Sequence, residues 1–535
     1  MQRLLVANRG EIALRCFRAA RSLGIETVAV LAPDDGGSLH ARSADATVEI
    51  ASYLDASEHV RAARESGADA VHPGYGFLAE SAEFAEAVLA AGLTWVGPPP
   101  AALRAGGDKL AAKRTAAAAG VPVLPTGMPE EIGFPLLVKA AAGGGGRGMR
   151  IVREPAGLDD AVDAARREAT AAFGVGTVFF ERYLERPRHV EIQLLADRHG
   201  TVLALGERDC SVQRRHQKVL EESPSPALDS ELRARMSAAA VAFARAIGYE
   251  SAGTAEFVLD GREFFFLELN ARIQVEHPVT ELVTGVDLVC EQLRIADGAH
   301  LELHPDLHGH AVEVRLYAED PRTFLPQAGR IERLQLPAGI RVDAGVEEGD
   351  EIGTSYDPMI AKLVAHAPTR AAAFEQLASA LRETEVGGVT TNLPFLRWLV
   401  AHPLVRAGQT TTAFLTEHPP LSEAPPHAPG PAWSGAWRLN LPAPPPRPVP
   451  DVDAAAHEPG PTPEQAAITA PMPGTVIKVL VAAGDHVSAR QPLVVLEAMK
   501  METPLVSPYD ATVRAVHVGE GDRVAGGTLL VELED

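Results

Sequence analysis

Apolar and polar positions at the start of the chain predict a β–α–β unit. Residues 3–7 form a short apolar run, residues 11–22 have the periodicity of a helix that ends before Gly24, and residues 26–31 are apolar again. A helix between two buried strands implies a parallel sheet. The turn at residues 8–11 lacks the glycine pattern of dinucleotide-binding folds, so dinucleotide binding is not supported.

Residues 253–281 predict a hairpin whose second strand has one polar face. Asp260-Gly261 marks the turn, and Pro278 marks where regular pairing should stop. Polar residues stand at every second position and so share a face; they are Glu268, Asn270, Arg272, Gln274 and Glu276. The apolar residues between them must face the core; they are Leu267, Leu269, Ile273 and Val275. This order of oxygen ligands, cation, amide and carboxylate suits a divalent metal ion beside an anion, although a solvated strand face would alternate in the same way.

The length of the hairpin loop decides whether Glu256 joins this polar face. A two-residue loop at Asp260-Gly261 would place Glu256 and Glu268 on opposite faces. A three-residue loop, residues 259–261 with Gly261 left-handed in a bulge, places both on the same face. We therefore predict the three-residue loop.

A glycine-rich run lies between two apolar runs, at residues 134–140 and 149–152. It reads Gly-Gly-Gly-Gly-Arg-Gly from residue 143 to residue 148. Each glycine weakens a strand by roughly 0.5–1 kcal/mol, so the run favours a segment that moves or brings backbone amides to an anion. A flexible linker is the alternative, but we predict a phosphate lid. Lys139, in the preceding apolar run, needs an anion to keep its charge.

Residues 213–218 form a local basic cluster. Strand spacing would place Arg214, His216 and Lys218 on one face, although a solvated face is the commoner outcome for a charge run. The 535-residue chain has a formal net charge of −22, from 71 acidic and 49 basic residues. This balance argues against general binding to nucleic acids or anionic membranes, which makes a local basic cluster more significant.

The overall composition indicates a multidomain cytoplasmic protein. Its length suggests about three or four domains. The three cysteines are widely spaced and show no metal-binding pattern, which indicates a reducing compartment; they are Cys16, Cys210 and Cys290. We find neither a signal peptide at the N-terminus nor an apolar run of membrane-spanning length, so we expect no membrane partner.

The C-terminal part combines a proline-rich linker with an internal repeat. Residues 419–463 hold 15 of the 42 prolines, and the segment Trp433–Asn440 within them is apolar enough to indicate docking. Twelve residues between Pro471 and Glu497 recur identically 37 positions later. The repeat predicts two similar β halves about a pseudo-two-fold axis. The turn between them presents Lys500 flanked by two methionines, which is unusual in a solvent turn and typical of a carrier for a covalent group.

These motifs resemble those of a known family. Residues 1–416 resemble biotin carboxylase, an ATP-grasp enzyme, through the sequences at 143–150, 213–218 and 270–281. Residues 466–535 resemble a biotin carboxyl carrier domain, with Ala-Met-Lys-Met at 498–501 as the biotinylation motif. The whole chain resembles the biotin-containing α subunit of an acyl-CoA carboxylase.

The resemblance implies an α/β and α+β multidomain chain. Its expected parts are an N-terminal α/β domain (1–106), an ATP-grasp domain with a glycine-rich lid (107–302), a carboxylase C-terminal domain (303–416), a Pro/Ala-rich linker with a Trp-containing docking segment (417–465), and an all-β flattened-sandwich biotinyl domain (466–535).

The resemblance also implies the site residues. Those for ATP are Lys109, Lys139, Gly145, Gly146, Glu181, Arg182, Tyr183, Leu184, His189, Gln213, His216, Glu256 and Glu268. Two magnesium or manganese ions would be held by Glu256, Glu268 and Asn270, and bicarbonate by Lys218, Arg272, Gln274, the Val275 amide and Glu276. Glu276 would be the general base, Arg315 would stabilise the developing biotin enolate, and Lys500 would carry the biotin; Lys218 and Arg272 complete the catalytic set.

The implied reaction activates bicarbonate with ATP as carboxyphosphate and passes the carboxyl group to the biotin ureido nitrogen. The expected partners are a carboxyltransferase β subunit acting on an acyl-CoA such as acetyl- or propionyl-CoA, a biotin protein ligase, and a second carboxylase domain in a homodimer. The sequence departs from the family at Ala142 and Arg182, where glycine and lysine are usual, and the β-barrel docking domain usual in related α subunits is reduced to Trp433–Asn440.

Two alternatives remain at this level. One is a scaffolding subunit with an inactive carboxylase half, against which the intact Lys218, Arg272, Glu276 and Arg315 argue. The other is a different ATP-grasp ligase with a lipoyl-type carrier, against which the methionines beside Lys500 argue.

Overall fold

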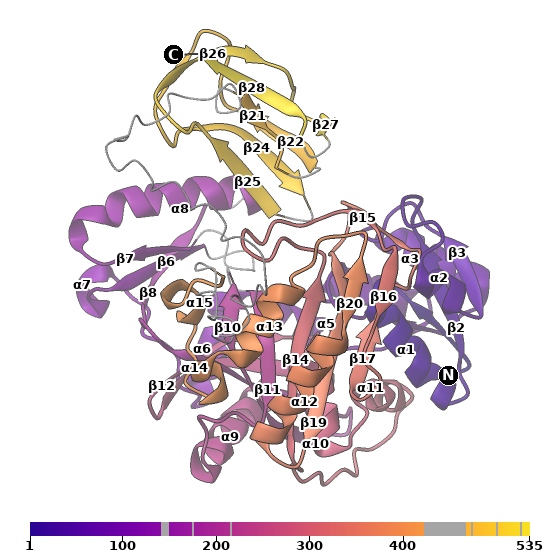
Figure 1. Ribbon diagram of the computed structural model, residues 1–535. Helices are drawn as coiled ribbons and strands as arrows, with labels where there is room; N and C mark the ends of the chain where they lie inside the picture. Colours follow the sequence, from indigo (N-terminus) through magenta and orange to yellow (C-terminus); the bar gives the residue numbers. More distant parts are fainter. Residues whose placement is uncertain are drawn as a thin grey trace, which may run out of the picture.

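The computed structural model describes residues 1–140, 149–173, 176–214, 217–421, 467–471, 474–498, 501–524 and 527–534. These residues form a mixed α/β part up to residue 421 and an all-β part from residue 467, coloured yellow in Figure 1. The predicted linker island Trp433–Asn440 lies outside the described residues.

A five-stranded parallel sheet opens the chain. Its strands, in the order β3-β2-β1-β4-β5, are Ala46–Glu49, Glu26–Leu31, Arg3–Val6, Ala70–His72 and Thr94–Trp95. The helices here are α1 (Gly10–Ser22), α2 (Leu39–Ser43), α3 (Ala56–Ser66), α4 (Ala82–Ala90) and α5 (Pro100–Gly107). The predicted β–α–β unit is confirmed, because β1 and β2 pair in parallel on either side of α1.

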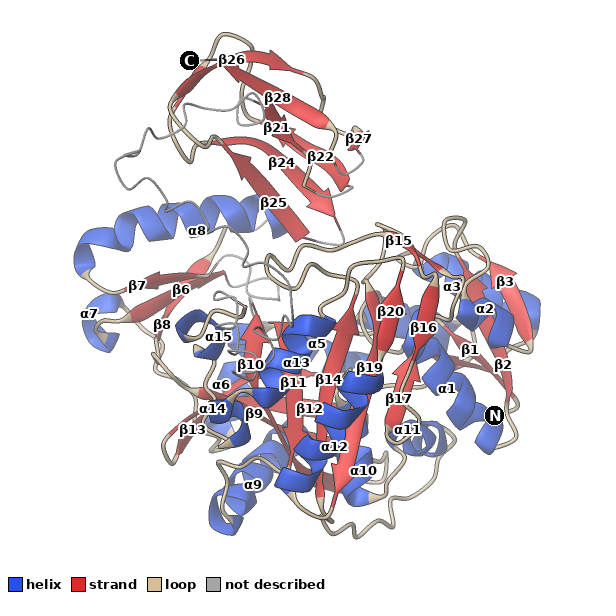
Figure 2. Ribbon diagram, in the orientation of Figure 1, coloured by secondary structure: helices blue, strands red, loops and turns tan. Residues whose placement is uncertain are grey.

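An eight-stranded sheet follows, in the order β13-β12-β9-β10-β11-β14-β19-β17. These strands are Glu263–Asn270, Ser251–Asp260, Arg188–Ala196, Val202–Arg214, Gln217–Ser223, His310–Tyr317, Met359–Ala367 and Arg341–Ala344. Because β11 pairs with β14, one sheet runs across the boundary predicted between residues 302 and 303. Its neighbouring helices are α9 (Ser230–Ala246), α10 (His277–Thr284), α11 (Leu288–Ala296), α12 (Arg370–Glu383) and α13 (Leu393–Ala401), and Figure 2 shows α12 and α13 over the strands.

A smaller three-stranded sheet, in the order β7-β6-β8, stands beside the large one. It consists of Arg150–Val152, Leu136–Ala140 and Val178–Arg182, and α8 (Leu158–Phe173) packs on it. The predicted lid, residues 143–148, lies outside the described residues; the strands on either side of it, β6 and β7, pair antiparallel. Two short ribbons complete this part, β15 (Gly329–Arg330) with β18 (Glu351–Ile352) and β16 (Arg333–Gln335) with β20 (Glu385–Gly387).

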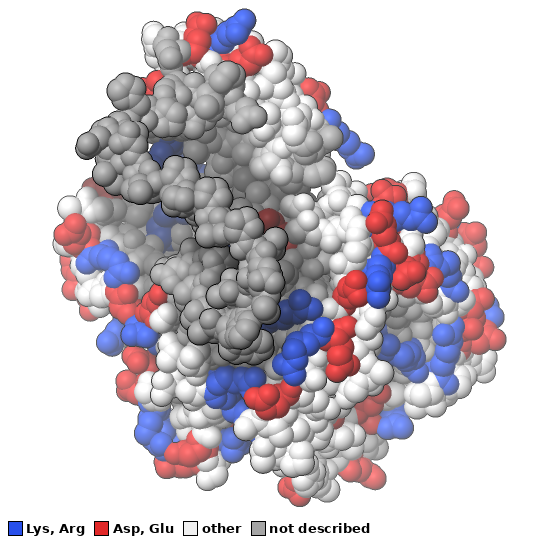
Figure 3. Space-filling model, in the orientation of Figure 1, with Lys and Arg blue, Asp and Glu red and all other residues white. Residues whose placement is uncertain are grey.

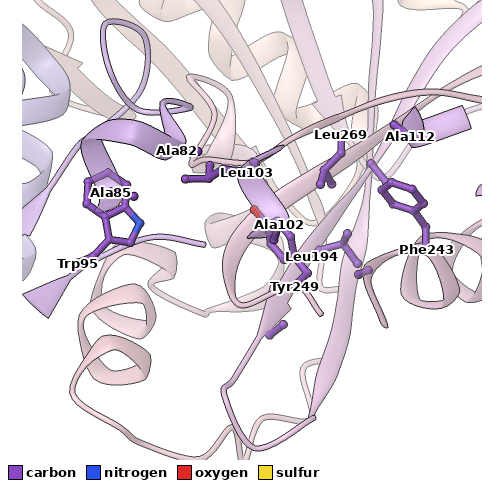
Figure 4. Close-up of a cluster of buried hydrophobic side chains, with 14 of the residues drawn as sticks. Ala82, Ala85, Trp95, Ala102, Leu103, Ala112, Leu194, Phe243, Tyr249 and Leu269 are labelled. Atoms are coloured by element: carbon purple, nitrogen blue, oxygen red, sulfur yellow. The ribbon is translucent and has the colours of Figure 1, made fainter. Parts of the chain in front are cut away.

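The largest hydrophobic core joins the parallel sheet to the large sheet. Figure 4 shows part of it, where Trp95, Phe243 and Leu269 come from different elements. Leu269 stands between two predicted ligands on β13, and a Cβ added at Gly106 would lie 3.2 Å from its Cδ2. This close packing fixes the strand that carries the predicted metal ligands.

The C-terminal part confirms the internal repeat. Its two sheets have the orders β21-β28-β26-β23 and β25-β24-β22-β27. In chain order from β21 to β28 the strands are Ala467–Thr469, Gly474–Val479, His486–Val487, Pro492–Ala498, Met501–Val506, Ala511–Val516, Arg523–Val524 and Leu529–Glu534. Exchanging each strand for its repeat counterpart converts one sheet order into the other, as a two-fold axis requires. The repeated pairs Val476/Val513 and Leu493/Leu530 all lie in the core between the sheets.

The described surface carries both signs of charge. On the face in Figure 3, basic and acidic side chains are interspersed. Arg42, for example, forms ion pairs with Glu347 and Asp350. None of the helices in the described ranges combines the length and apolar character needed to cross a lipid bilayer.

Candidate functional site

Two adjoining cavities contain most of the predicted site residues. The first, of about 780 Å³, lies between the small sheet and the large sheet, and the second, of about 490 Å³, lies over the ends of β12 and β13. His189 lines both cavities, so they are neighbours. Each volume is within the range of roughly 300–1,000 Å³ typical of ligand pockets.

The first cavity has the character of a nucleotide site. Apolar side chains of Leu137, Ile151 and Leu267 form walls, and the short helix α15 (Phe414–Glu417) contributes to the rim. The predicted ATP residues that line it are Lys139, Glu181, Arg182, Tyr183, Leu184, His189 and Gln213. Gly145, Gly146 and His216 lie outside the described residues.

Two lysines contact one carboxylate that lines this cavity. Lys139 of β6 and Lys113 of α6 (Lys109–Ala118) both contact Glu181, which is fully buried. Burial, followed by repulsion from Lys139 and Lys109, lowers the pKa of Lys113 to about 6. Burial, followed by repulsion from Lys109, lowers the pKa of Lys139 to about 8. Glu268 opposes both shifts, and a bound phosphate would do the same, so the amines are suited to an anion. Sequence reasoning missed Lys113, although it stands one helical turn after Lys109.

The hairpin of β12 and β13 brings the predicted metal ligands together. Glu256 lies directly opposite Glu268 and so shares its face, as predicted, but the predicted three-residue loop is wrong. Asp260 pairs with Glu263, so the turn is the two residues Gly261 and Arg262, with Gly261 at φ +60°. The register changes instead at a bulge that skips Leu267. That bulge turns Leu267, which was predicted to face the core, into the wall of the first cavity.

The predicted strand end is also wrong. β13 ends at Asn270, eight residues before Pro278, and α10 begins at His277 with Glu276 as its N-cap residue. The irregular segment between them nevertheless keeps the predicted bicarbonate residues in the second cavity. The residues that line this cavity include Arg272, Gln274, Val275 and Glu276, together with Lys109, Lys218, Glu256, Glu268, Asn270 and Arg315.

Lys218 lines the second cavity and contacts three carboxylates. Its Nζ donates to Glu256 Oε1 and Glu276 Oε1, each at 2.7 Å, and also contacts Glu191. The prediction that Arg214 shares a strand face with Lys218 is wrong. The two residues lie on different strands, because β10 ends at Arg214 and β11 begins at Gln217, and Arg214 pairs with Gln217. Arg214 instead bonds Glu319 at 3.2 Å.

Glu276 is held ionised between two cations. Its Oε1 accepts from Lys218, and its Oε2 lies 3.0 Å from a guanidinium nitrogen of Arg315. Burial alone would raise the pKa of Glu276, but the attraction of Lys218 and Arg315 outweighs it and lowers that pKa below its usual range. The carboxylate is therefore charged and free of its own proton at neutral pH.

The residues around Glu256 fit a divalent metal ion. Glu256 Oε1 accepts from Asn270 Nδ2 at 2.8 Å, and Glu268 Oε2 lies 3.0 Å from Lys109 Nζ. Lysine ammonium groups thus lie against both carboxylates. Burial raises the pKa of Glu256, but Lys218 and His189 lower it well below the usual value. Two ionised carboxylates and an amide oxygen on one face are the hard ligands that magnesium and manganese prefer.

Several supporting residues gave no sequence signal. Glu191 contacts Lys218, and Glu221 contacts Arg315. Glu80 accepts from the Ala271 amide at 3.2 Å and lies 3.3 Å from Arg272 Nε. The loop dense in turn formers at residues 72–80 thus ends against the bicarbonate segment, which a motif search alone could not show.

Lys500 lies outside the described residues. The strands on either side of it, β24 and β25, pair as far as Ala498 and Met501.

Family models match four parts of the chain. They are the biotin carboxylase N-terminal domain over residues 1–103, the ATP-binding domain of the carbamoyl-phosphate synthase L chain over 108–304, the biotin carboxylase C-terminal domain over 313–417, and the biotin-requiring enzyme model over 466–533.

Curated proteins are similar over long stretches. The α subunit of mitochondrial methylcrotonoyl-CoA carboxylase from Oryza sativa is 48% identical over 445 residues, which are 78% of this chain and 60% of that protein. This chain thus spans about 60% of the length of the first relatives that it matches. The α3 subunit of the biotin-dependent acyl-coenzyme A carboxylase from Mycobacterium leprae is 40% identical over 597 residues, covering 99% of this chain and 98% of that one.

Solved structures share the carboxylase part. The biotin carboxylase domain of Hydrogenobacter thermophilus 2-oxoglutarate carboxylase superposes with a TM-score of 0.76 and 43% identity, over 78% of this chain and 98% of that one. That structure is a dimer in complex with MgADP, ADP and bicarbonate.

Proposed function

The chain belongs to the biotin carboxylase family of ATP-grasp ligases, and we propose that it carboxylates biotin carried on its own Lys500 and supplies a separate carboxyltransferase subunit. The acceptor we propose is an acyl-CoA, such as acetyl- or propionyl-CoA, because several relatives are acyl-CoA carboxylase subunits.

The observation that carries the proposal is the convergence of two cations on one carboxylate, with a third cation lining the same cavity, beside a nucleotide-sized cavity. Lys218 and Arg315 bond Glu276, and Arg272 lines the same cavity. Bicarbonate is a small anion and a weak nucleophile, so it needs fixed cations to bind and a base to deprotonate it.

Glu276 is assigned as that base. Without ligand, Lys218 and Arg315 hold the pKa of Glu276 too low for efficient proton transfer. An anion bound within reach adds a like charge beside the carboxylate and competes for Lys218. Both effects raise the pKa of Glu276 toward the operating pH.

The adjoining cavity is assigned to ATP. Lys139 and His189 line this cavity, and His189 also lines the second, so these residues would place the terminal phosphate beside bicarbonate. Lys113 lies behind them, against Glu181. Glu256, Glu268 and Asn270 would hold the metal ions. A bound divalent ion would supply Lewis-acid stabilisation of the charge on the transferring phosphoryl group.

Arg315 is assigned to biotin. It is buried, lines the second cavity, and is fixed by Glu221 and Glu276. A guanidinium in this position can hold the ureido oxygen and orient the nitrogen that receives the carboxyl group.

The remaining assignments concern assembly and location. We propose a biotin protein ligase that modifies Lys500, a carboxyltransferase β subunit, and contacts between two carboxylase parts. The dimeric Hydrogenobacter domain supports the last. A cytoplasmic location is consistent with three buried free cysteines.

The purified chain tests the proposal directly. It should cleave ATP only when bicarbonate is present and should carboxylate free biotin added in excess. ATP cleavage that is independent of bicarbonate would contradict the assignment of the second cavity.

The glycine-rich run gives a separate prediction. Replacing Gly145 and Gly146 together by Val should raise the KM for ATP by about tenfold, because β-branched residues restrict the backbone angles that bring amides onto phosphate. The KM for bicarbonate should change little. An unchanged KM for ATP would mean that the run is only a spacer.

A further inference from the structure

Arg208, in the middle of β10, is a completely buried guanidinium with a complete set of acceptors. Its side chain has no exposed surface. A guanidinium has five N–H donors, and each here meets a different oxygen. The five acceptors are Glu191 Oε1, Gln193 Oε1, Thr280 Oγ1, Thr254 Oγ1 and Gln274 Oε1, at 2.5–3.0 Å.

Three of these acceptors support the bicarbonate residues. Glu191 contacts both Arg208 and Lys218, so Arg208 holds in place the carboxylate that orients the Lys218 amine. Thr280 belongs to α10, whose N-cap is Glu276. Gln274 is itself a predicted bicarbonate residue.

The contact with Gln274 also sets the orientation of an amide. Gln274 Oε1 accepts from Arg208 at 2.8 Å, so its Nε2 must point the other way, where it donates to Glu256 Oε1 at 3.0 Å. Without Arg208, only the bond from Nε2 to Glu256 would orient the amide, and Oε1 would lose its donor. The segment 274–276 and the face of Glu256 would then lose a common support.

We propose that Arg208 is a positioning residue for bicarbonate, acting through Gln274, Glu191 and α10 without touching the substrate. The inference rests on the proposed function and extends it to a residue outside both cavities. None of its five acceptors lines the nucleotide cavity, whereas Gln274 lines the second cavity, so its influence should fall mainly on bicarbonate.

Lysine cannot replace this arginine. A lysine ammonium has three donors at one point, whereas the acceptors here come from β9, β12, α10 and the 271–276 segment and surround a planar group. Arg208→Lys keeps the charge but leaves at least two acceptors without a donor. The bonds at risk include those to Gln274 and Thr280.

The experiment compares Arg208→Lys with Arg233→Lys. Arg233 bonds the buried Glu207, next to Arg208 in sequence, at 2.8 Å through two nitrogens, but it lines neither cavity. We expect Arg208→Lys to raise the KM for bicarbonate about tenfold to a hundredfold and to change the KM for ATP less than twofold. Arg233→Lys should lower the melting temperature without separating the two KM values.

A second pair of variants covers the case in which Arg208→Lys does not fold. Thr280→Val and Thr254→Val each remove one acceptor and keep the side-chain shape. Thr280→Val should raise the KM for bicarbonate a few-fold, and more than Thr254→Val does, because only Thr280 lies on the helix that Glu276 caps.

The outcomes distinguish a failure of the proposed function from a failure of the positioning role of Arg208. If the unmodified chain shows no bicarbonate-dependent ATP cleavage, the proposed function fails. If the unmodified chain is active but Arg208→Lys leaves the KM for bicarbonate unchanged, or raises both KM values equally, the positioning role of Arg208 is wrong. The same criterion applies to Thr280→Val if Arg208→Lys does not fold.

Discussion

Glu276→Gln should reduce bicarbonate-dependent ATP cleavage by about 10²–10⁴-fold, the usual contribution of a general base. The amide keeps the shape of the carboxylate and can still accept from Lys218 or Arg315, but it cannot take a proton. The rate of ADP release at saturating ATP and bicarbonate measures the effect. Circular dichroism should show that the secondary structure is retained.

The matched control for this variant is Glu281→Gln. Glu281 is buried on α10, whose N-cap residue is Glu276, and is also held by two cations, at 2.8 Å from Arg15 and 2.7 Å from Arg341, but it does not line the second cavity. Its replacement should affect stability more than turnover. Near-normal turnover in Glu276→Gln would show that another group takes the proton.

Lys500→Arg should abolish all carboxylation of the final acceptor. Arginine keeps the positive charge of the side chain but has no amine that a biotin ligase can acylate. The carboxylase part should still carboxylate free biotin at the rate of the unmodified chain, because the carrier is tethered and not built into the cavity. Mass spectrometry of the intact chain measures biotin attachment, and a coupled assay with the carboxyltransferase partner measures overall transfer.

Lys478→Arg is the control for the carrier. Lys478 is the other lysine of the C-terminal part and lies within β22, where it pairs with Val495. This variant should remain biotinylated and active. Biotin found on Lys478, or overall activity in Lys500→Arg, would contradict the carrier assignment.

The predictable parts of the fold are those with a local signal. The β–α–β unit follows from apolar runs around one amphipathic helix, and the carrier sandwich follows from a repeat whose conserved positions, such as Val476 and Val513, are core residues in both halves. These signals lie within a few turns or one repeat of the chain.

The errors arose where no local signal exists. Residues 264–267 are all apolar, so their pattern does not show whether the extra residue of the hairpin lies at the tip or at Leu267. Residues 213–218 contain neither glycine nor proline, so their pattern predicts a continuous strand and does not show that β10 ends at Arg214 and β11 begins at Gln217.

The supporting residues of the site could not be found by spacing. Arg208 and Lys113 each look like ordinary charged residues, and their roles appear only when strands distant in sequence meet. Arg208 bonds residues 15 to 72 positions away. Sequence motifs therefore identify the residues predicted to contact substrates, whereas only the tertiary structure identifies the residues that hold them in place.

Transfer of labelled carboxylate to Lys500 tests the central claim most directly. The biotinylated chain is mixed with ATP, magnesium and labelled bicarbonate, without any acceptor, and the peptide that carries Lys500 is analysed. Label should appear on that peptide only when ATP is present. Because a tether gives an effective concentration on the order of millimolar, the rate per chain should not change on dilution of the protein. A chain that carboxylates free biotin yet leaves Lys500 unlabelled, or labels it at a rate that falls in proportion to dilution, would contradict the claim that it serves its own carrier.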